Sequence, residues 1–208
     1  MGVKKSKGEY VLLMDSDQIL KNNDVISNAV KMMRKFDMLI LEEFSFKEET
    51  FTEKLIANDK RLIHENFELQ KDPLEGTLLP RFYKKGLLDK VFFSIPKDII
   101  DVVLAQDHAI IYYESSKVSN KIGLLKNAVL HNEPSSLVDL IRKNFRWGKY
   151  ERKLLEFDYY KNLYKKKIRF RKVELTSGTY LKWFQSFVLL MIKGIPYKLG
   201  FFLGEGRK

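Results

Sequence analysis

Apolar and polar positions alternate along the chain in short blocks that predict strands followed by helices. Stretches rich in apolar residues predict strands at residues 9–14, 38–41, 78–83 and 124–130. Apolar residues at helical spacing, or capping residues, predict helices at residues 23–36, 48–66, 107–115 and 135–150, and residues 88–100 fit either element. The alternation favours an α/β sandwich, and we find no internal repeat or low-complexity linker.

The C-terminal segment, residues 180–203, has a different pattern. It is apolar, but Lys193 and Lys198 interrupt it and Pro196 is expected to break it. Its longest uncharged part, 183–192, is about half the length that a membrane-spanning helix needs. We therefore predict two short amphipathic helices lying at a membrane interface. The alternative is a C-terminal helix packed on the domain's own core.

The charge balance supports an anionic partner. The chain of 208 residues carries 38 Lys and Arg against 27 Asp and Glu, a formal net charge of +11. Such an excess suits anionic lipid, phosphorylated substrates or nucleic acid, but no nucleic-acid-binding motif accompanies it. The stretch KNLYKKKIRFRK at 161–172 has no acidic residue and is either a solvated basic face or a binding patch. We expect a catalytic region at 1–160 and a basic, membrane-surface segment at 161–208, on the cytoplasmic side.

Two carboxylates, Asp15 and Asp17, follow the apolar run VLLM directly. Two acids one residue apart repel each other, so they mark either a solvated turn or a cation site. The end of a strand is where α/β sheets bind ligands. No cysteine is present, which excludes disulfides and thiolate sites, and three histidines leave little material for an all-histidine site. Oxygen ligands favour Mg²⁺ or Mn²⁺.

The stretch GVKKSKGEYVLLMDSD resembles the segment of family-2 glycosyltransferases that carries their Asp-x-Asp motif. Three later segments match family features in the same order: AQDH at 105–108, VLH at 129–131 and LIRKNFRWG at 140–148. The closing stretch GIPYKLGFFLG also resembles the tails of membrane-associated members. The resemblance spans nearly the whole chain. It implies a GT-A-type, Rossmann-like α/β/α sandwich and an inverting transfer of sugar from a nucleotide-diphosphate donor to a glycan or lipid-linked acceptor.

The resemblance also implies roles for individual residues. The metal ion would be held by Asp15, Asp17 and His131, with Asp15 also near the ribose. Asp107 would be the general base. The leaving diphosphate would be stabilised by Arg142, Lys143 and Arg146. The residues themselves leave plainer interpretations open: Asp107 as a helix cap, His131 as a structural histidine, and Arg146 as a cover for Trp147.

Only fourteen residues precede Asp15, whereas the family places its nucleotide-binding half before the Asp-x-Asp motif. We therefore expect a chain that lacks most of that half, with an apolar sheet edge at residues 11–14. Four explanations stay open: a mis-called start, a split gene in which a separate chain supplies the missing contacts, a degenerate copy, or a protein repurposed without the donor site. We expect the isolated chain to bind nucleotide sugars weakly. The alternative is a non-catalytic membrane-surface or interaction protein built on the same scaffold.

Overall fold

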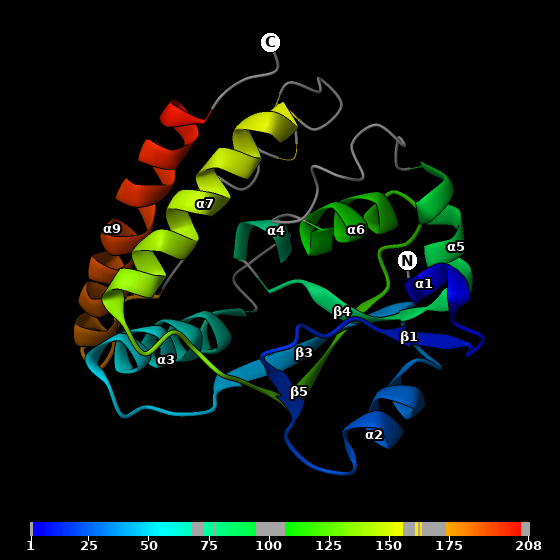
Figure 1. Cartoon of the computed structure of the whole chain (residues 1–208). Coiled ribbons are helices and arrows are strands. Elements are labelled where there is room, and N and C mark those ends of the chain that lie inside the picture. The colour runs from blue at the N-terminus through cyan, green and yellow to red at the C-terminus, as the bar shows by residue number, and fades with distance from the viewer. Residues whose placement is uncertain are drawn as a thin grey trace.

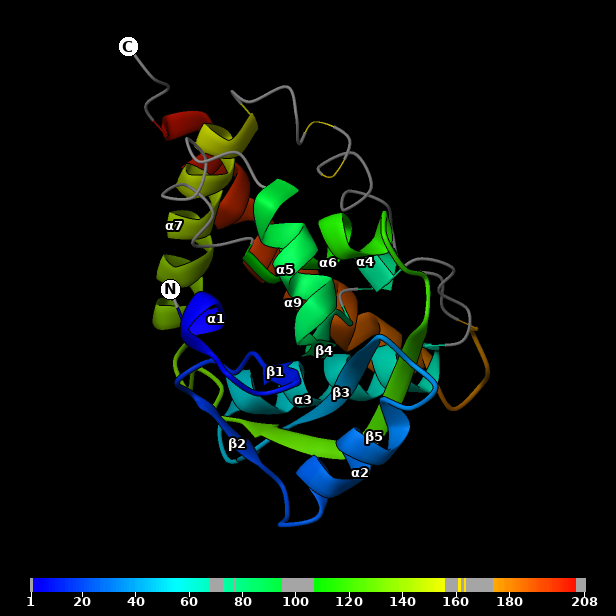
Figure 2. The same cartoon turned by 90° about the vertical axis from the view of Figure 1, so that its right-hand side faces the viewer.

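Five strands form one mixed sheet that curls into a half-barrel (Figures 1 and 2). The computed structural model describes residues 2–67, 73–76, 78–94, 107–155, 161, 163 and 174–204. The sheet order is β1-β4-β3-β5-β2, with β3 and β5 parallel and the other neighbours antiparallel. The strands are β1 (Tyr10–Leu12), β2 (Gln18–Leu20), β3 (Met38–Ser45), β4 (Pro80–Lys84) and β5 (Ile122–His131). Four of them were predicted from sequence, and the predicted α/β class is confirmed.

Helices cover both faces of the sheet. Side chains alternate between the two faces along each strand, so each face carries apolar residues that helices can cover. Met38 and Tyr83 belong to one apolar cluster with helices α5 and α6, whereas Leu39 and Phe82 belong to another with α2. Strand β1 is an edge strand, as expected, but Val11 is buried rather than exposed. The helices are α1 (Gly2–Lys5), α2 (Val25–Met32), α3 (Phe51–Glu65), α4 (Pro73–Gly76), α5 (Lys85–Ser94), α6 (Asp107–Ser116), α7 (Leu137–Leu155) and α9 (Tyr180–Leu203).

Polar side chains fix where two of the helices begin. Thr50 and Glu53 form a reciprocal capping box at the start of α3. The Oγ atom of Ser136 accepts a hydrogen bond from the Val138 N–H at 3.1 Å, so Ser136 caps α7. The N-terminal part of the ambiguous segment 88–100 is helical in α5, and its remainder, 95–100, lies outside the described residues.

A bulge in β5 sets the register of the functional end of the sheet. Met38 pairs with Ile122 and Ser45 with His131, so β5 contains two more residues than β3 between these pairs. Asn127 sits in the bulge with φ of 55°, and its N–H donates to Glu42 Oε2 at 2.6 Å. Without the bulge Val129 would lie opposite Ser45. The bulge therefore brings His131 beside the end of β3.

The C-terminal segment forms one continuous helix, α9, and the predicted pair of short helices is wrong. The helix runs through Pro196, because packing on α7 and α3 offsets the local cost of proline. A Cβ atom added to Gly148 would lie 2.0 Å from the Tyr197 carbonyl oxygen, and one added to Gly200 would lie 2.0 Å from that of Phe145. Glycines on both helices thus allow a close crossing beside Pro196. Residue 160, where we predicted the domain boundary, lies outside the described residues. So does the basic run 161–172, apart from residues 161 and 163.

We expect Gly148→Ala to destabilise the protein by about 1–3 kcal/mol, because the added methyl group overpacks the α7–α9 crossing. Alanine is the better helix former by about 1 kcal/mol, so the packing cost has to exceed that gain. Gly194→Ala is the matched control within α9, since nothing lies within 4 Å of its added carbon. The control should leave stability unchanged or raise it. Urea unfolding followed by circular dichroism measures both, and equal effects would contradict the close crossing.

Candidate functional site

A cavity of about 410 Å³ lies among β3, β4, α3, α7 and α9. One part of its wall is apolar and includes Ile56, Leu140 and Trp147. The other part is charged and is formed by Glu43, Lys60, Arg81, His108, His131 and Glu133. A site of this kind suits a ligand with an apolar or ring-shaped body and a charged, reacting group.

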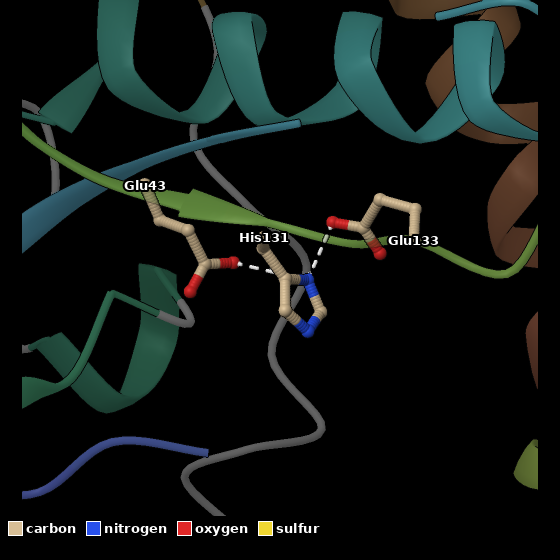
Figure 3. A group of neighbouring side chains, drawn as sticks. All are labelled: Glu43, His131 and Glu133. Atoms are coloured by element: carbon tan, nitrogen blue, oxygen red, sulfur yellow. Dashed lines mark hydrogen bonds and ion pairs between the residues drawn. The ribbon is translucent and has the colours of Figure 1, made fainter. Parts of the chain in front are cut away.

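His131 lies between two carboxylates at the charged end of the cavity (Figure 3). Its Nδ1 atom is 2.7 Å from Glu133 Oε1 and 3.5 Å from Glu43 Oε1. On the other side of the ring, Nε2 is 3.1 Å from Asp17 Oδ2. Lys60 completes the group, with its Nζ atom 2.5 Å from Glu43 Oε1 and in an ion pair with Glu133. We call Glu43, Lys60, His131 and Glu133 the His131 cluster.

Opposing effects act on the pKa values of Glu133 and His131. Burial alone would raise the pKa of the Glu133 carboxyl, but the hydrogen bond with His131 and the charge of Lys60 lower it to about 2. Burial would lower the pKa of His131, yet the hydrogen bond and negative charge of Glu133, with that of Glu43, raise it. His131 contacts Glu133 through Nδ1 and Asp17 through Nε2, so its ring orients both carboxylates.

Asp15 has its own partners. Arg81 Nη1 lies 2.9 Å from Asp15 Oδ2, and His108 Nε2 lies 3.4 Å from Asp15 Oδ1. The hydrogen bond from His108, and the charge of Arg81, hold the pKa of Asp15 well below its usual range despite partial burial. The Gln18 N–H donates to the Asp15 carbonyl at 3.2 Å, so the two aspartates lie in a turn between β1 and β2. Of the two interpretations of Asp15 and Asp17, a turn or a cation site, the turn is therefore correct for the backbone.

Asp17 keeps one carboxylate oxygen without a partner. Its Oδ2 atom faces His131, but within the described part of the chain the shielded Oδ1 atom makes no hydrogen bond. A shielded, unpaired carboxylate oxygen is costly unless it binds something. Ligand atoms of Glu43, His131 and Glu133 also lie within 4.8 Å of one another, but the Lys60 ammonium group already lies among them, 2.5 Å from Glu43 Oε1 and 3.2 Å from His131 Nδ1. The free carboxylate oxygen of Asp17 is a donor of the kind that Mg²⁺ or Mn²⁺ prefers.

The remaining predicted residues are divided between the cavity and the surface. Asp107 is the exposed first residue of α6, where its Oδ1 accepts the His108 N–H at 2.7 Å, next to the residue that contacts Asp15. Lys143 lines the cavity, with Nζ 5.1 Å from the centre of the Trp147 ring. Arg142 and Arg146 are exposed and do not line it. Trp147 is thus accompanied by Lys143, rather than by Arg146 as the plainer interpretation held.

The sequence reasoning did not identify Glu43, Lys60 or Glu133. Glu133 stands one residue after the His131-Asn132 pair, the same spacing as in Asp15-Ser16-Asp17, and this repeat of strand end plus acid was a usable signal. Glu43 and Lys60 gave no such signal, because contacts between distant parts of the chain bring them together.

No protein-family model matches this chain, and a search of the curated proteins finds no match either. The function therefore has to be inferred from the residues and their geometry. The facts that bear on it are the shielded oxygen of Asp17, the His131 cluster and the cavity beside them.

Proposed function

We propose that this chain forms part of an inverting, metal-dependent glycosyltransferase of the GT-A type, acting on a nucleotide-diphosphate sugar. The observation that carries the proposal is the unpaired, shielded Oδ1 atom of Asp17 at the turn after β1, next to a charged cavity. The resemblance of residues 2–17 to an Asp-x-Asp segment gives that turn its proposed role. Transfer would take place at the cytoplasmic face of a membrane.

In this proposal Asp17 holds a Mg²⁺ or Mn²⁺ ion through its free oxygen, and Asp15 lies within reach of the ion or the ribose. When bound, the ion neutralises charge on the leaving diphosphate. His131 supports the site by fixing Asp17 through the 3.1 Å contact, rather than as the first ligand, because both its ring nitrogens face carboxylates. Arg81 and Lys143 are the cavity cations best placed to stabilise the diphosphate. Arg142 and Arg146 would act at longer range from the surface.

The acceptor would occupy the cavity. A sugar ring or the first part of a lipid chain suits the wall formed by Trp147, Leu140 and Ile56. The acceptor hydroxyl attacks the anomeric carbon, the bond to the diphosphate breaks, and the hydroxyl proton passes to Asp107. This makes a glycan or lipid-linked alcohol the proposed acceptor class.

We assign none of the described residues to the nucleotide base. The residues that the structure describes would supply the metal ligand, the general base and the acceptor cavity.

A second candidate is a non-catalytic interaction protein on the same scaffold. The observation in its favour is that Lys60 already neutralises Glu43 and Glu133, and Arg81 already pairs with Asp15. Such ion pairs hold a structure together without any ligand. The two candidates differ in whether Asp17 binds a metal ion.

We expect Asp17→Asn to weaken Mn²⁺ binding at least about tenfold, since even the loss of groups that only support a metal ligand typically costs that much. Asp24→Asn, at an exposed turn before α2, is the matched control and should bind Mn²⁺ like the parent. Electron paramagnetic resonance of free Mn²⁺, with and without uridine or guanosine diphosphate, is the measurement. If the parent binds no Mn²⁺, or if both variants bind equally, the non-catalytic candidate is favoured.

A further inference from the structure

Helix α9 contacts the domain through polar as well as apolar side chains, since Leu189 is buried against Leu55 and Leu140. The side facing the domain carries hydrogen-bonding groups: Gln185 accepts from Asn58 Nδ2 at 2.8 Å, Ser186 donates to Asp59 at 2.5 Å, and Lys182 pairs with Glu65 at 2.6 Å. A helix at an aqueous surface normally turns its apolar side inward. Here the polar groups already have partners within the domain.

The outward side of α9 is an apolar stripe. It consists of Leu181, Phe184, Met191, Ile195, Leu199 and Phe202, each between 45% and 69% exposed. At 100° per residue these six positions fall within one narrow sector of the helix, running its whole length. An apolar patch of this extent on a soluble surface marks a binding face. We call it the α9 stripe.

The charge beside the α9 stripe indicates what covers it. The exposed side of α7, which lies next to α9 in Figures 1 and 2, carries Arg142, Arg146 and Lys149, with Asp139 near Arg142. The chain as a whole has a net charge of +11. Two copies meeting at this face would bring like charges together, which disfavours a homodimer. An anionic lipid surface would bury the apolar side chains of the α9 stripe and would also attract the cations of α7.

The helix is long enough to cross a bilayer, with 24 residues or about 36 Å and a suitably apolar composition. Its inner contacts argue for another orientation. A spanning α9 would lose its bonds to α3 and its close crossing with α7, and would bring Gln185, Ser186 and Lys193 into hydrocarbon.

We propose that α9 lies flat in the surface of an anionic membrane, with the α9 stripe inserted among the lipids and the rest of the domain on one side. This interaction surface does not depend on the proposed glycosyl transfer. It would hold equally for the non-catalytic candidate.

The test is sedimentation of the full chain with vesicles of phosphatidylcholine, alone or with phosphatidylglycerol. The triple variant Phe184→Gln/Ile195→Gln/Phe202→Gln should lower the partition coefficient at least about tenfold. The matched control, Ile19→Gln/Ile26→Gln/Val118→Gln, changes three apolar side chains that are 39–50% exposed elsewhere, and should bind like the parent. Raising the salt concentration should weaken binding without abolishing it. Equal partitioning of all three proteins overturns the proposal, as does a change in self-association alone.

A second measurement separates a flat helix from a spanning one. The chain has no cysteine, so Ser177→Cys and Arg207→Cys can each be labelled on a clean background. In intact cells a membrane-impermeant maleimide should label neither site, and after lysis it should label both. Labelling of one site in intact cells would show that α9 crosses the membrane and would overturn the flat orientation. Neither measurement requires a sugar donor, so a failed transfer assay leaves this inference standing.

Discussion

Asp107→Asn is expected to lower the rate of glycosyl transfer by about 10²–10⁴-fold, the usual cost of removing a general base. Asparagine cannot take up the proton that leaves the hydroxyl group of the acceptor. It keeps an oxygen for the hydrogen bond that Asp107 Oδ1 receives from the His108 N–H, so α6 should begin as before. The affinity for the donor should be unchanged, because Asp107 is assigned to the acceptor side. Initial rates of transfer at saturating donor concentration measure the loss.

Asp89→Asn is the control for Asp107→Asn. Asp89 is a partly exposed carboxylate on α5, paired with Lys85 at 2.7 Å, and is not among the residues that line the cavity. Its variant should transfer sugar at the parent rate. If Asp107→Asn also retained the parent rate, the base would have to be sought among the other groups near the cavity, and the resemblance at residues 105–108 would carry no functional meaning.

Lys60→Met should destabilise the protein by about 3–5 kcal/mol at neutral pH, because it leaves buried carboxylates without their cation. The side chain of Glu133 is 6% exposed and that of Glu43 is 18% exposed, so water replaces little of the lost charge. Methionine keeps most of the length and volume of lysine. Urea unfolding of the parent and the variant gives the difference directly.

The effect of Lys60→Met should depend on pH. The pKa of Glu133 is lowered from 4.5 to about 2, so ionised Glu133 stabilises the parent fully above pH 4.5 and progressively less as the pH falls toward 2. The stability difference between parent and variant should therefore shrink in the same range. Lys182→Met, which removes the half-exposed pair with Glu65, should cost less than about 1 kcal/mol. Equal losses for the two lysines would mean that the His131 cluster is effectively solvated.

Local patterns were sufficient for most of the fold. Four strands were found from runs of apolar residues, and α7 from its spacing and its capping serine. Strand β2 was missed, because Gln18–Leu20 is only three residues long and its pairing with β5 is decided by the fold. The break at Pro196 was wrong for a similar reason. The local preference of proline was outweighed by packing between α7 and α9, which no sequence window contains.

Prediction of the candidate site also succeeded for local patterns and failed for contacts that form only on folding. Asp15 and Asp17 were selected because they follow an apolar run, and His131 because of the family resemblance; the structure joins Asp17 to His131 directly. The two-residue bulge in β5 that brings His131 beside β3 depends on Asn127 adopting a positive φ, which the sequence does not announce. Lys60 lies in the middle of α3 and meets Glu43 and Glu133 only after folding. A sequence motif within one segment does not reveal the residues of another helix or strand that neutralise its charges.

Three consecutive residues of α3 have different neighbours. Asn58 and Asp59 bond to Gln185 and Ser186 of α9, whereas Lys60 bonds to Glu43 and Glu133. A helix turn is stiff on this scale, so its backbone cannot shift toward one set of partners without moving the other. A movement of α9 against the domain would therefore also move the Lys60 ammonium group. A solvent that loosens α9, such as a detergent micelle, would also alter the charge balance around His131, and measurements on the site in detergent would describe a different electrostatic environment from those on a bilayer.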